Sequence, residues 1–562
     1  MTLAAHWFEQ HRERLNTAVS FLHSREAWTP FVESPSRRHH PDGAHDAGRR
    51  AYEARLGETF ALDLPGQMGW LGAERSPYTG ELLEVRYPRV AAEPLAEAML
   101  KAWPAWRQAS VAERVGVCME MLDRWAQQSF EHTYATMHTT GQPFMLAFAG
   151  SGASSLDRGL EALAMAWDVM QALPRRATYA RHFGRGAPVR LEKRYRPMPV
   201  GIAVVLSCGS YPAWNAYPAM MANLATGNPV VVKPHPETIL PMAIAVETAR
   251  TCLQEAGFDP NLLTLACDTW EEPIATALFD HPATAIIDFT GGQQFGTWIE
   301  ERYSARRQVY TETAGCNAVV LDSAADLDAA LGAIAHGMAF FSAQMCTAPQ
   351  NIWVPRTGVR DGDTLIDANT VVDRLREQID ALVEQPHMAA AVCGALHASR
   401  TLDACTALQT QSADRVVRPS APYAHPDYPN ARTATPLLIR LDAQERALAQ
   451  REHFGPMAFV IQADDRDQAL AGATQDARRC GAIASYAYTT DPSFIGEVED
   501  AFALAGASVG INLVRQRPIN FTAAFSDYHV TGLNPAGNAC LTDPAFVQRR
   551  FRMVQSKVEL PE

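Results

Sequence analysis

GIAVVLSCG, at residues 201–209, decides the fold, because a β-branched run there ends in small and polar residues. Similar runs follow along the chain: GNPVVVKP at 227–234, LLTLAC at 262–267 and TAIIDFTG at 284–291. Helical stretches separate them, such as PMAIAVETARTCLQEAG at 241–257. Short strands that alternate with helices predict an α/β fold with a parallel, doubly wound sheet. Ligands of such sheets bind beyond the carboxyl ends of the strands, so the residues there are the first site candidates.

A second α/β unit is predicted to begin near QVYTETAGCNAVVLD, at residues 308–322, and to end near VGINL, at 509–513. Its strand candidates are NIWVP at 351–355, TATPLLIRL at 433–441, FGPMAFVIQ at 454–462 and ASYAYTT at 484–490. The last part of the chain, FVQRRFRMVQSKVEL at 546–560, alternates polar and apolar residues like an exposed strand. An exposed strand of this kind often pairs with another subunit.

Composition and charge limit the function classes. The chain has 562 residues, 47% hydrophobic and 20% charged, with a formal net charge of -13, so two or three globular lobes are expected. The negative charge is spread along the chain, which disfavours nucleic acid and anionic lipid as partners. Neither a signal-peptide core nor a run of about 20 apolar residues is present, so we expect a cytoplasmic protein.

Cysteine and histidine spacing does not favour a metal site. The ten cysteines include no C-x-x-C pair, which predicts reduced thiols. A helical pattern at residues 8–24 leads into a polar loop at 34–50 that contains His39, His40 and His45. No cysteine or carboxylate accompanies these histidines at metal-ligand spacing, so no metal is assigned.

The strand ends supply candidates for chemistry. TGGQQFG at 290–296 can open a helix with Gly291 and Gly292 at its N-terminus, where free N–H groups favour a pyrophosphate, although a glycine pair is more often a simple turn. Further on, ETAGCN places Glu312 and FFSAQMCTAPQN places Cys346 on either side of one helical stretch. A carboxylate and a thiol together suit a general base and a nucleophile.

Six motifs occur in the order and approximate spacing of the aldehyde dehydrogenase superfamily, which the chain resembles over roughly residues 66–556. They are AWNAYP, GNPVVVKP, FTGGQQFG, the Glu312 segment, AQMC and EHFGP. An ordered set of this kind is far more specific than any one motif. The resemblance implies a Rossmann-type cofactor lobe, a second α/β catalytic lobe, and an oligomerisation element made of a β-hairpin and the C-terminal strand.

The resemblance also implies roles for the residues at these positions. Cys346 resembles the nucleophile, and Asn215 resembles the amide that holds the oxyanion together with the Cys346 backbone N–H. Glu312 resembles the base that activates water to hydrolyse a thioester. A base at this position argues against a purely CoA-acylating reaction, since water is then the acyl acceptor.

The cofactor implied is NADP or NAD. Residues that resemble its binding site are Lys233 for the adenosine ribose, Glu452 for the nicotinamide ribose, Phe454 beside it, and Trp214, Gly291 and Gly292 along the pyrophosphate. Pro236 replaces a glutamate that many NAD-selective relatives carry, and loss of that carboxylate favours NADP, helped by Lys233 and His235. Glu237 next to it could reverse this preference. The segment 267–278 lacks the usual Gly-rich turn, and Gln350 stands where arginine is frequent.

Longer signatures narrow the resemblance to phenylacetic acid degradation proteins of bacteria. They are HTTGQPFMLAF, GNPVVVKPHPETILP, QMCTAPQNIWVP and AAFSDYHVTGLNPAGNACLTDPAFVQRRFRMVQS. The implied substrate is a ring-opened, CoA-linked semialdehyde, 3-oxo-5,6-dehydrosuberyl-CoA semialdehyde, of aerobic phenylacetate degradation. Two rival hypotheses stay open: a CoA-acylating aldehyde dehydrogenase, and a catalytically silent protein that retains the fold.

The expected domain division follows from the resemblance. Residues 1–65 form an N-terminal helical appendage, and 309–513 form the catalytic domain. The dinucleotide-binding domain comprises 66–182 and 203–308. The oligomerisation element comprises 183–202 and 514–562, and implies a homodimer or homotetramer.

Overall fold

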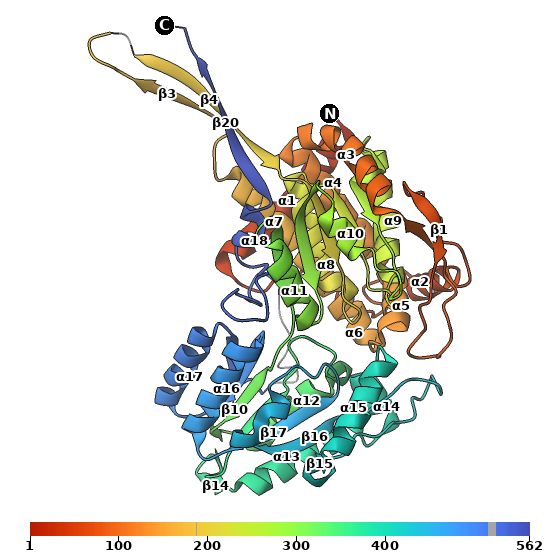
Figure 1. Cartoon of the computed structure of the whole chain (residues 1–562), viewed down its shortest axis with the longest axis vertical. Helices are drawn as coiled ribbons and strands as arrows, with labels where there is room; N and C mark the ends of the chain where they lie inside the picture. The colour runs from red at the N-terminus through yellow and green to blue at the C-terminus, as the bar shows by residue number, and fades with distance from the viewer. Residues whose placement is uncertain (187, 515–523, 562) are drawn as a thin grey trace.

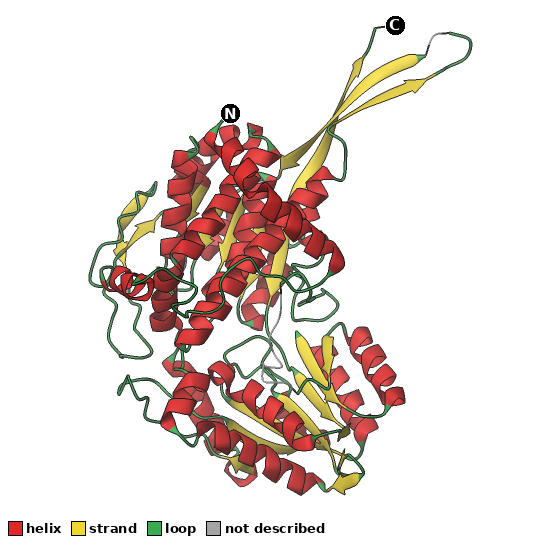
Figure 2. Ribbon diagram, turned by 180° about the vertical axis from the view of Figure 1, so that it is seen from behind, coloured by secondary structure: helices red, strands yellow, loops and turns green. Residues whose placement is uncertain are grey.

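The computed structural model describes residues 1–186, 188–514 and 524–561. Two α/β lobes lie one above the other, and a long β arm projects from the upper lobe (Figures 1 and 2). Parts of the expected oligomerisation element, residues 187, 515–523 and 562, lie outside the described residues. Within the described ranges no helix combines the length and hydropathy needed to cross a membrane.

The upper lobe contains a five-stranded parallel sheet in the order β7-β6-β5-β8-β9. Its strands are β5 (Ile202–Leu206), β6 (Val230–Lys233), β7 (Leu263–Leu265), β8 (Thr284–Thr290) and β9 (Gln308–Glu312). The predicted parallel α/β sheet is therefore confirmed. One expectation was wrong: residues 309–312 were assigned to the catalytic lobe, but they add an edge strand to this sheet by pairing with β8.

Helices cover both faces of this sheet. They are α3 (Ala92–Gln108), α4 (Val111–Gln127), α5 (Ser129–Thr140), α6 (Phe144–Phe148), the π-helical turn η1 (Ala149–Ala153), α7 (Ser154–Gln171), α8 (Pro212–Thr226), α9 (Leu240–Glu255), α10 (Ala275–Asp280) and α11 (Gln293–Tyr303). A small hairpin of β1 (Gln67–Leu71) and β2 (Tyr87–Val90) lies beside them. Ser110 and Glu113 form a capping box that fixes where α4 begins.

The opening segment is part of the upper lobe's core. Helix α1 (Leu3–Ser24) buries Trp7, Phe8 and Leu15 in the same hydrophobic cluster as the sheet, and α2 (Ala44–Glu53) follows it. A Cβ at Gly116 would lie 2.4 Å from the Ala4 carbonyl oxygen, so α1 and α4 approach each other closely. Residues 1–65 were expected to be an appendage, but α1 packs into the core because its apolar stripe needs a partner face.

The lower lobe contains a seven-stranded sheet in the order β15-β16-β17-β12-β10-β18-β19, parallel except for β15. The strands are β10 (Ala318–Leu321), β12 (Asn351–Pro355), β15 (Val416–Arg418), β16 (Leu437–Asp442), β17 (Met457–Ala463), β18 (Ala484–Tyr488) and β19 (Ser508–Ile511). The helices are α12 (Leu327–Ala339), η3 (Phe340–Ala343), α13 (Ala368–Val383), α14 (Pro386–Cys393), α15 (Ser399–Gln411), α16 (Arg466–Cys480) and α17 (Pro492–Ala505). The strands β11 (Ser323–Ala324), β13 (Val359–Asp361) and β14 (Thr364–Ile366) form a minor sheet.

The arm is a three-stranded antiparallel sheet in the order β20-β4-β3. It consists of β3 (Arg176–Arg181), β4 (Val189–Pro199) and β20 (Phe551–Glu559), and Figure 1 shows it reaching well beyond the lobes. The last strand therefore pairs with β4 of its own chain, while β3 and β20 form the two edges of the sheet. Pairing across subunits stays a prediction.

Arg550 ties the end of the chain to the upper sheet. Its guanidinium is fully buried, contacts Asp288 on β8 at 2.7 Å, and donates to Asn223 Oδ1 at 3.0 Å. Arg550→Ala would leave the Asp288 carboxylate buried without its cation, so we expect the free energy of unfolding to fall by roughly 3–5 kcal/mol. Denaturant unfolding measures this. The exposed Arg552→Ala variant is the control, with an expected change below about 0.5 kcal/mol, and equal losses in both variants would contradict the prediction.

Candidate active site

One cavity of about 1260 Å³ contains every predicted site residue. Its lining includes residues of both lobes. The nine predicted residues that line it are Trp214, Asn215, Lys233, Gly291, Gly292, Glu312, Cys346, Glu452 and Phe454. Their side chains come from loops and strand ends that are distant in sequence, so the fold brings together what the motifs identified separately.

Cys346 lies in a tightly held loop after η3. Phe341, Ser342 and Ala343 before it have positive φ values of 49°, 49° and 52°, a conformation that costs non-glycine residues energy. The Asn317 amide donates to the Cys346 carbonyl at 2.8 Å and to the Ala348 carbonyl at 3.0 Å. These contacts fix the backbone from which the thiol projects.

Two functional groups, from Glu312 and His529, meet around the Cys346 thiol. Cys346 Sγ lies 3.7 Å from Glu312 Oε1 and 3.5 Å from His529 Nε2. His529 Nε2 is also 3.1 Å from Glu312 Oε1. His529 and Glu312 are almost fully buried, with 4% and 1% of their surface exposed. His529 lies in the segment AAFSDYHVTGLNPAGN, and no role was predicted for it.

The charges around Glu312 favour its ionised form. Burial alone would raise the pKa of this carboxyl, but His529, Arg158 and Asn215 outweigh burial and lower it. Burial raises the pKa of the Cys346 thiol well above its ordinary value, and the nearby Glu312 carboxylate raises it further. The site therefore holds an ionised base beside a thiol that loses its proton only with help.

Asn215 is oriented by Arg158, a residue for which no role was predicted. It lies in the first turn of α8, and Arg158 on α7 donates to its Oδ1 at 3.0 Å. The guanidinium also lies over the Trp214 ring, 4.5 Å from its centroid, and donates to the Trp214 carbonyl. Because the amide oxygen accepts from Arg158, the Nδ2 group is the donor of this side chain, and its hydrogen bond to Glu312 contributes to the lowered pKa of that carboxyl. Arg158 is the one basic residue of α7, and this was the feature of the sequence that could have indicated a role for it.

The end of the cavity lined by the predicted cofactor-binding residues combines a helix start with charged side chains. Gly292 caps the N-terminus of α11, and a Cβ at Gly291 would lie 2.7 Å from the Phe289 ring. Lys233 Nζ contacts Asp268 Oδ1 at 2.7 Å. Burial raises the pKa of Glu452 to about 7. Gln350, at the position where arginine was expected, donates to the Arg451 carbonyl at 3.0 Å and so supports the loop that carries Glu452.

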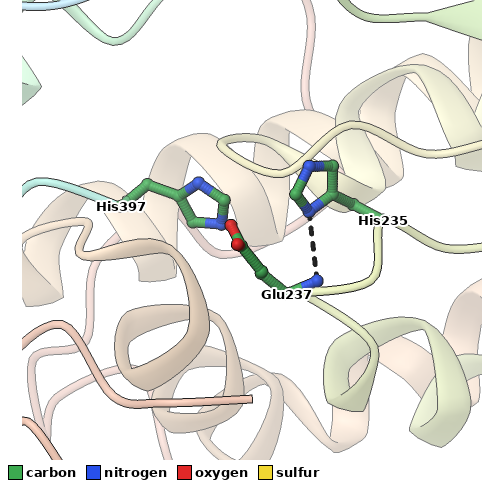
Figure 3. A group of neighbouring side chains, drawn as sticks. All are labelled: His235, Glu237 and His397. Carbon is green, nitrogen blue, oxygen red and sulfur yellow. Dashed lines mark hydrogen bonds between the residues drawn. The ribbon is translucent and has the colours of Figure 1, made fainter. Parts of the chain in front are cut away.

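His235, Glu237 and His397 form a cluster at this end of the cavity (Figure 3). His235 Nδ1 accepts a hydrogen bond from the Glu237 backbone N–H, and His397 Nε2 is 2.9 Å from Thr238 Oγ1. Arg400 and Trp270 both donate to the Glu237 carboxylate at 3.2 Å. These bonds engage His235 Nδ1, His397 Nε2 and the Glu237 carboxylate.

Comparison with known proteins identifies the class. Residues 74–534 match the aldehyde dehydrogenase family, and the chain belongs to this family of enzymes. An NAD-dependent aldehyde dehydrogenase from Burkholderia multivorans has a similar solved structure, with 42% identity, full coverage of both chains and a TM-score of 0.97. A Thermus 1-pyrroline-5-carboxylate dehydrogenase with bound NAD shares the fold, with a TM-score of 0.75 at 17% identity, over 95% of this chain and 100% of that one.

Curated relatives match over shorter segments. A 1-pyrroline-5-carboxylate dehydrogenase of Bacillus pumilus is 26% identical over 57% of this chain and 62% of its own length. An aldehyde dehydrogenase-like protein of Saccharomyces cerevisiae is 27% identical over 51% of this chain and 44% of its own length. The chain thus spans about half the length of these relatives.

Proposed function

We propose that this protein oxidises an aldehyde to a carboxylic acid through a thioester on Cys346, with NAD or NADP as hydride acceptor. One observation carries the proposal: the Cys346 thiol lies 3.7 Å from the Glu312 carboxylate, and Asn215 lines the same cavity. A nucleophile, a base and an oxyanion donor are the groups that this reaction needs from the protein.

The first half of the proposed reaction uses Cys346 and Asn215. The thiolate attacks the aldehyde carbon, and the carbonyl electron pair moves to oxygen. The Asn215 amide and the Cys346 backbone N–H donate to the oxyanion that forms. Arg158 keeps the amide oriented through its bond to Oδ1. A bound nicotinamide dinucleotide would supply the hydride acceptor. Loss of hydride from the carbon leaves an acyl group on the Cys346 sulfur.

The second half uses Glu312. Its carboxylate takes a proton from water, and the water oxygen attacks the thioester carbon. The C–S bond breaks, releasing the carboxylic acid and the Cys346 sulfur. His529, Arg158 and Asn215 together outweigh burial and lower the pKa of Glu312, which supports an ionised base at neutral pH. This supports hydrolysis over transfer of the acyl group to free CoA.

The cavity suits a dinucleotide. Gly291 and Gly292 lie at the start of α11, where a pyrophosphate would bind. Lys233 and Glu452 line the same cavity and are proposed to bind the two riboses, and Trp214 and Phe454 also line it. Pro236 lines the cavity, while the Glu237 carboxylate is held by Arg400 and Trp270. Because Arg400 and Trp270 hold the Glu237 carboxylate, it is less able to repel the 2′-phosphate of NADP, and this supports NADP as the cofactor. Similarity to the Burkholderia enzyme supports NAD.

For the substrate we propose a CoA-linked semialdehyde of aerobic phenylacetate degradation, 3-oxo-5,6-dehydrosuberyl-CoA semialdehyde. The support is the resemblance of the longer signatures to the phenylacetic acid degradation protein PaaN. The large cavity, with Met145, Leu146 and Ala149 in its lining, is compatible with an extended and partly apolar aldehyde.

For assembly we propose a homodimer or homotetramer joined through the arm. Both edge strands of the arm, β3 and β20, leave backbone N–H and C=O groups available for pairing with another sheet. The proposal includes a division of the chain into a dinucleotide-binding domain, a catalytic domain and an oligomerisation element. It also includes a cytoplasmic location.

The experiment is a cofactor-reduction assay with the purified full chain. NAD and NADP are each tested with a panel of simple and CoA-linked aldehydes, with and without free CoA. Reduced cofactor and free carboxylic acid without added CoA are the expected products. Acyl-CoA formed only with free CoA would favour the acylating alternative. Failure of the chain to bind either dinucleotide would favour the silent protein.

A further inference from the structure

We propose that His529 is a catalytic residue that takes the thiol proton of Cys346 and holds the resulting thiolate beside the Glu312 carboxylate. The inference deepens the proposed function, since it rests on Cys346 as the nucleophile. The geometry that carries it is a closed triangle of Sγ, Oε1 and Nε2, with sides of 3.7, 3.5 and 3.1 Å.

The need for such a group follows from the charges. A thiolate and a carboxylate 3.7 Å apart, in a site where Glu312 is 1% exposed, repel each other strongly. Burial and the Glu312 carboxylate hold the pKa of the Cys346 thiol well above its ordinary value. The proposed reaction nevertheless needs the sulfur as a thiolate at a time when the Glu312 carboxylate is already ionised. A cation between them resolves this conflict.

The proton transfer is balanced within the triangle. The S–H bond of Cys346 breaks and an N–H bond forms at His529 Nε2, which gives a thiolate and an imidazolium. The neutral ring must carry its proton on Nδ1 beforehand. After transfer, the Nε2–H group lies between two anions, Sγ and Oε1, and can donate to either. No other bond changes, and no further reactant is needed.

The other ionisable groups around the thiol are poor proton acceptors. Burial raises the pKa of the Cys208 thiol to about 11 and the pKa values of the Tyr211 and Tyr486 phenols well above their ordinary value, so all three stay protonated. Arg158 is a cation whose charge favours the thiolate. Among these groups, His529 is the neutral base in contact with the thiol, with Nε2 3.5 Å from Sγ.

Alkylation of Cys346 by iodoacetamide tests the proposal without aldehyde or dinucleotide. Rates are measured on the full chain from acid to alkaline pH, and peptide mass spectrometry separates Cys346 from the other cysteines. We expect the wild-type rate to level off near neutral pH. In His529→Gln the rate should rise only towards alkaline pH and be at least about 100-fold lower at pH 7, because a paired imidazolium is what lowers a thiol pKa.

Controls separate this role from a structural one. His132→Gln removes another buried histidine, on α5 and outside the cavity lining, and should keep the wild-type profile. Equal profiles for wild type and His529→Gln would overturn the proposal and leave His529 as a support for Glu312. If His529→Gln does not fold, the wild-type profile still decides, since a rate that rises only at alkaline pH overturns the proposal. If Cys346 is alkylated as expected but the chain oxidises no aldehyde, the proposed function is refuted while the role of His529 stands.

Discussion

Cys346→Ala is expected to abolish aldehyde oxidation, with a loss of at least about 10⁴-fold in the rate of cofactor reduction. The reason is that the proposed acyl intermediate forms on the Cys346 sulfur, whereas the neighbouring Cys208 thiol donates to the Tyr211 carbonyl at 3.3 Å. Steady-state formation of reduced cofactor with a competent aldehyde measures the effect. Binding of NAD or NADP should persist, because the thiol adds little to the dinucleotide site.

A matched control for this variant is Cys252→Ala. Cys252 is a buried thiol on α9, outside the cavity lining, so its removal should leave the rate of aldehyde oxidation close to that of wild type. Substantial turnover by Cys346→Ala would contradict the covalent mechanism. Equal losses in both variants would indicate a general loss of fold.

Glu312→Gln is expected to stop the reaction after the first hydride transfer. The thioester should still form, but without the carboxylate no group takes the proton of the attacking water, so turnover should fall by about 10²- to 10⁴-fold. Rapid-mixing experiments should show roughly one equivalent of reduced cofactor per active site, followed by almost no further reduction of cofactor. Intact-mass measurement should find the acyl group on Cys346.

Two outcomes for Glu312→Gln would change the proposal. Full turnover restored by free CoA would favour the acylating alternative, because the thioester would then have another acceptor. Absence of the burst would mean that Glu312 acts before the thioester forms, consistent with its 3.7 Å contact to the thiol. The exposed Glu301→Gln variant on α11 is the control and should turn over normally.

The sequence predicted those site residues that follow a strand or belong to an ordered motif. Asn215 and Gly291 come after β5 and β8, and parallel strands bring such positions to one edge of a sheet. Cys346 and Glu312 came from the resemblance, which the match to the aldehyde dehydrogenase family confirms at the level of the fold. The roles of these residues stay proposals until the variants are measured.

Contacts between distant segments could not be read from the sequence. His529 reaches Cys346 across 183 positions, and Arg158 reaches Asn215 across 57, so neither pairing has a local pattern. The position of β9 had the same difficulty, since an edge strand with the sequence QVYTE does not reveal which sheet it joins. Pairing is decided by packing of the whole lobe, which outweighs local preference.

The way the upper lobe is closed also bears on how the protein is made. Leu541, Phe546 and Val547 fill the same core as α1, although more than 500 residues separate them from it. When a ribosome has produced residues 1–540, that core still lacks these side chains and the Arg550 anchor to Asp288. The nascent upper lobe therefore keeps an open apolar face until residues 541–550 have been added, and such a face favours aggregation during synthesis.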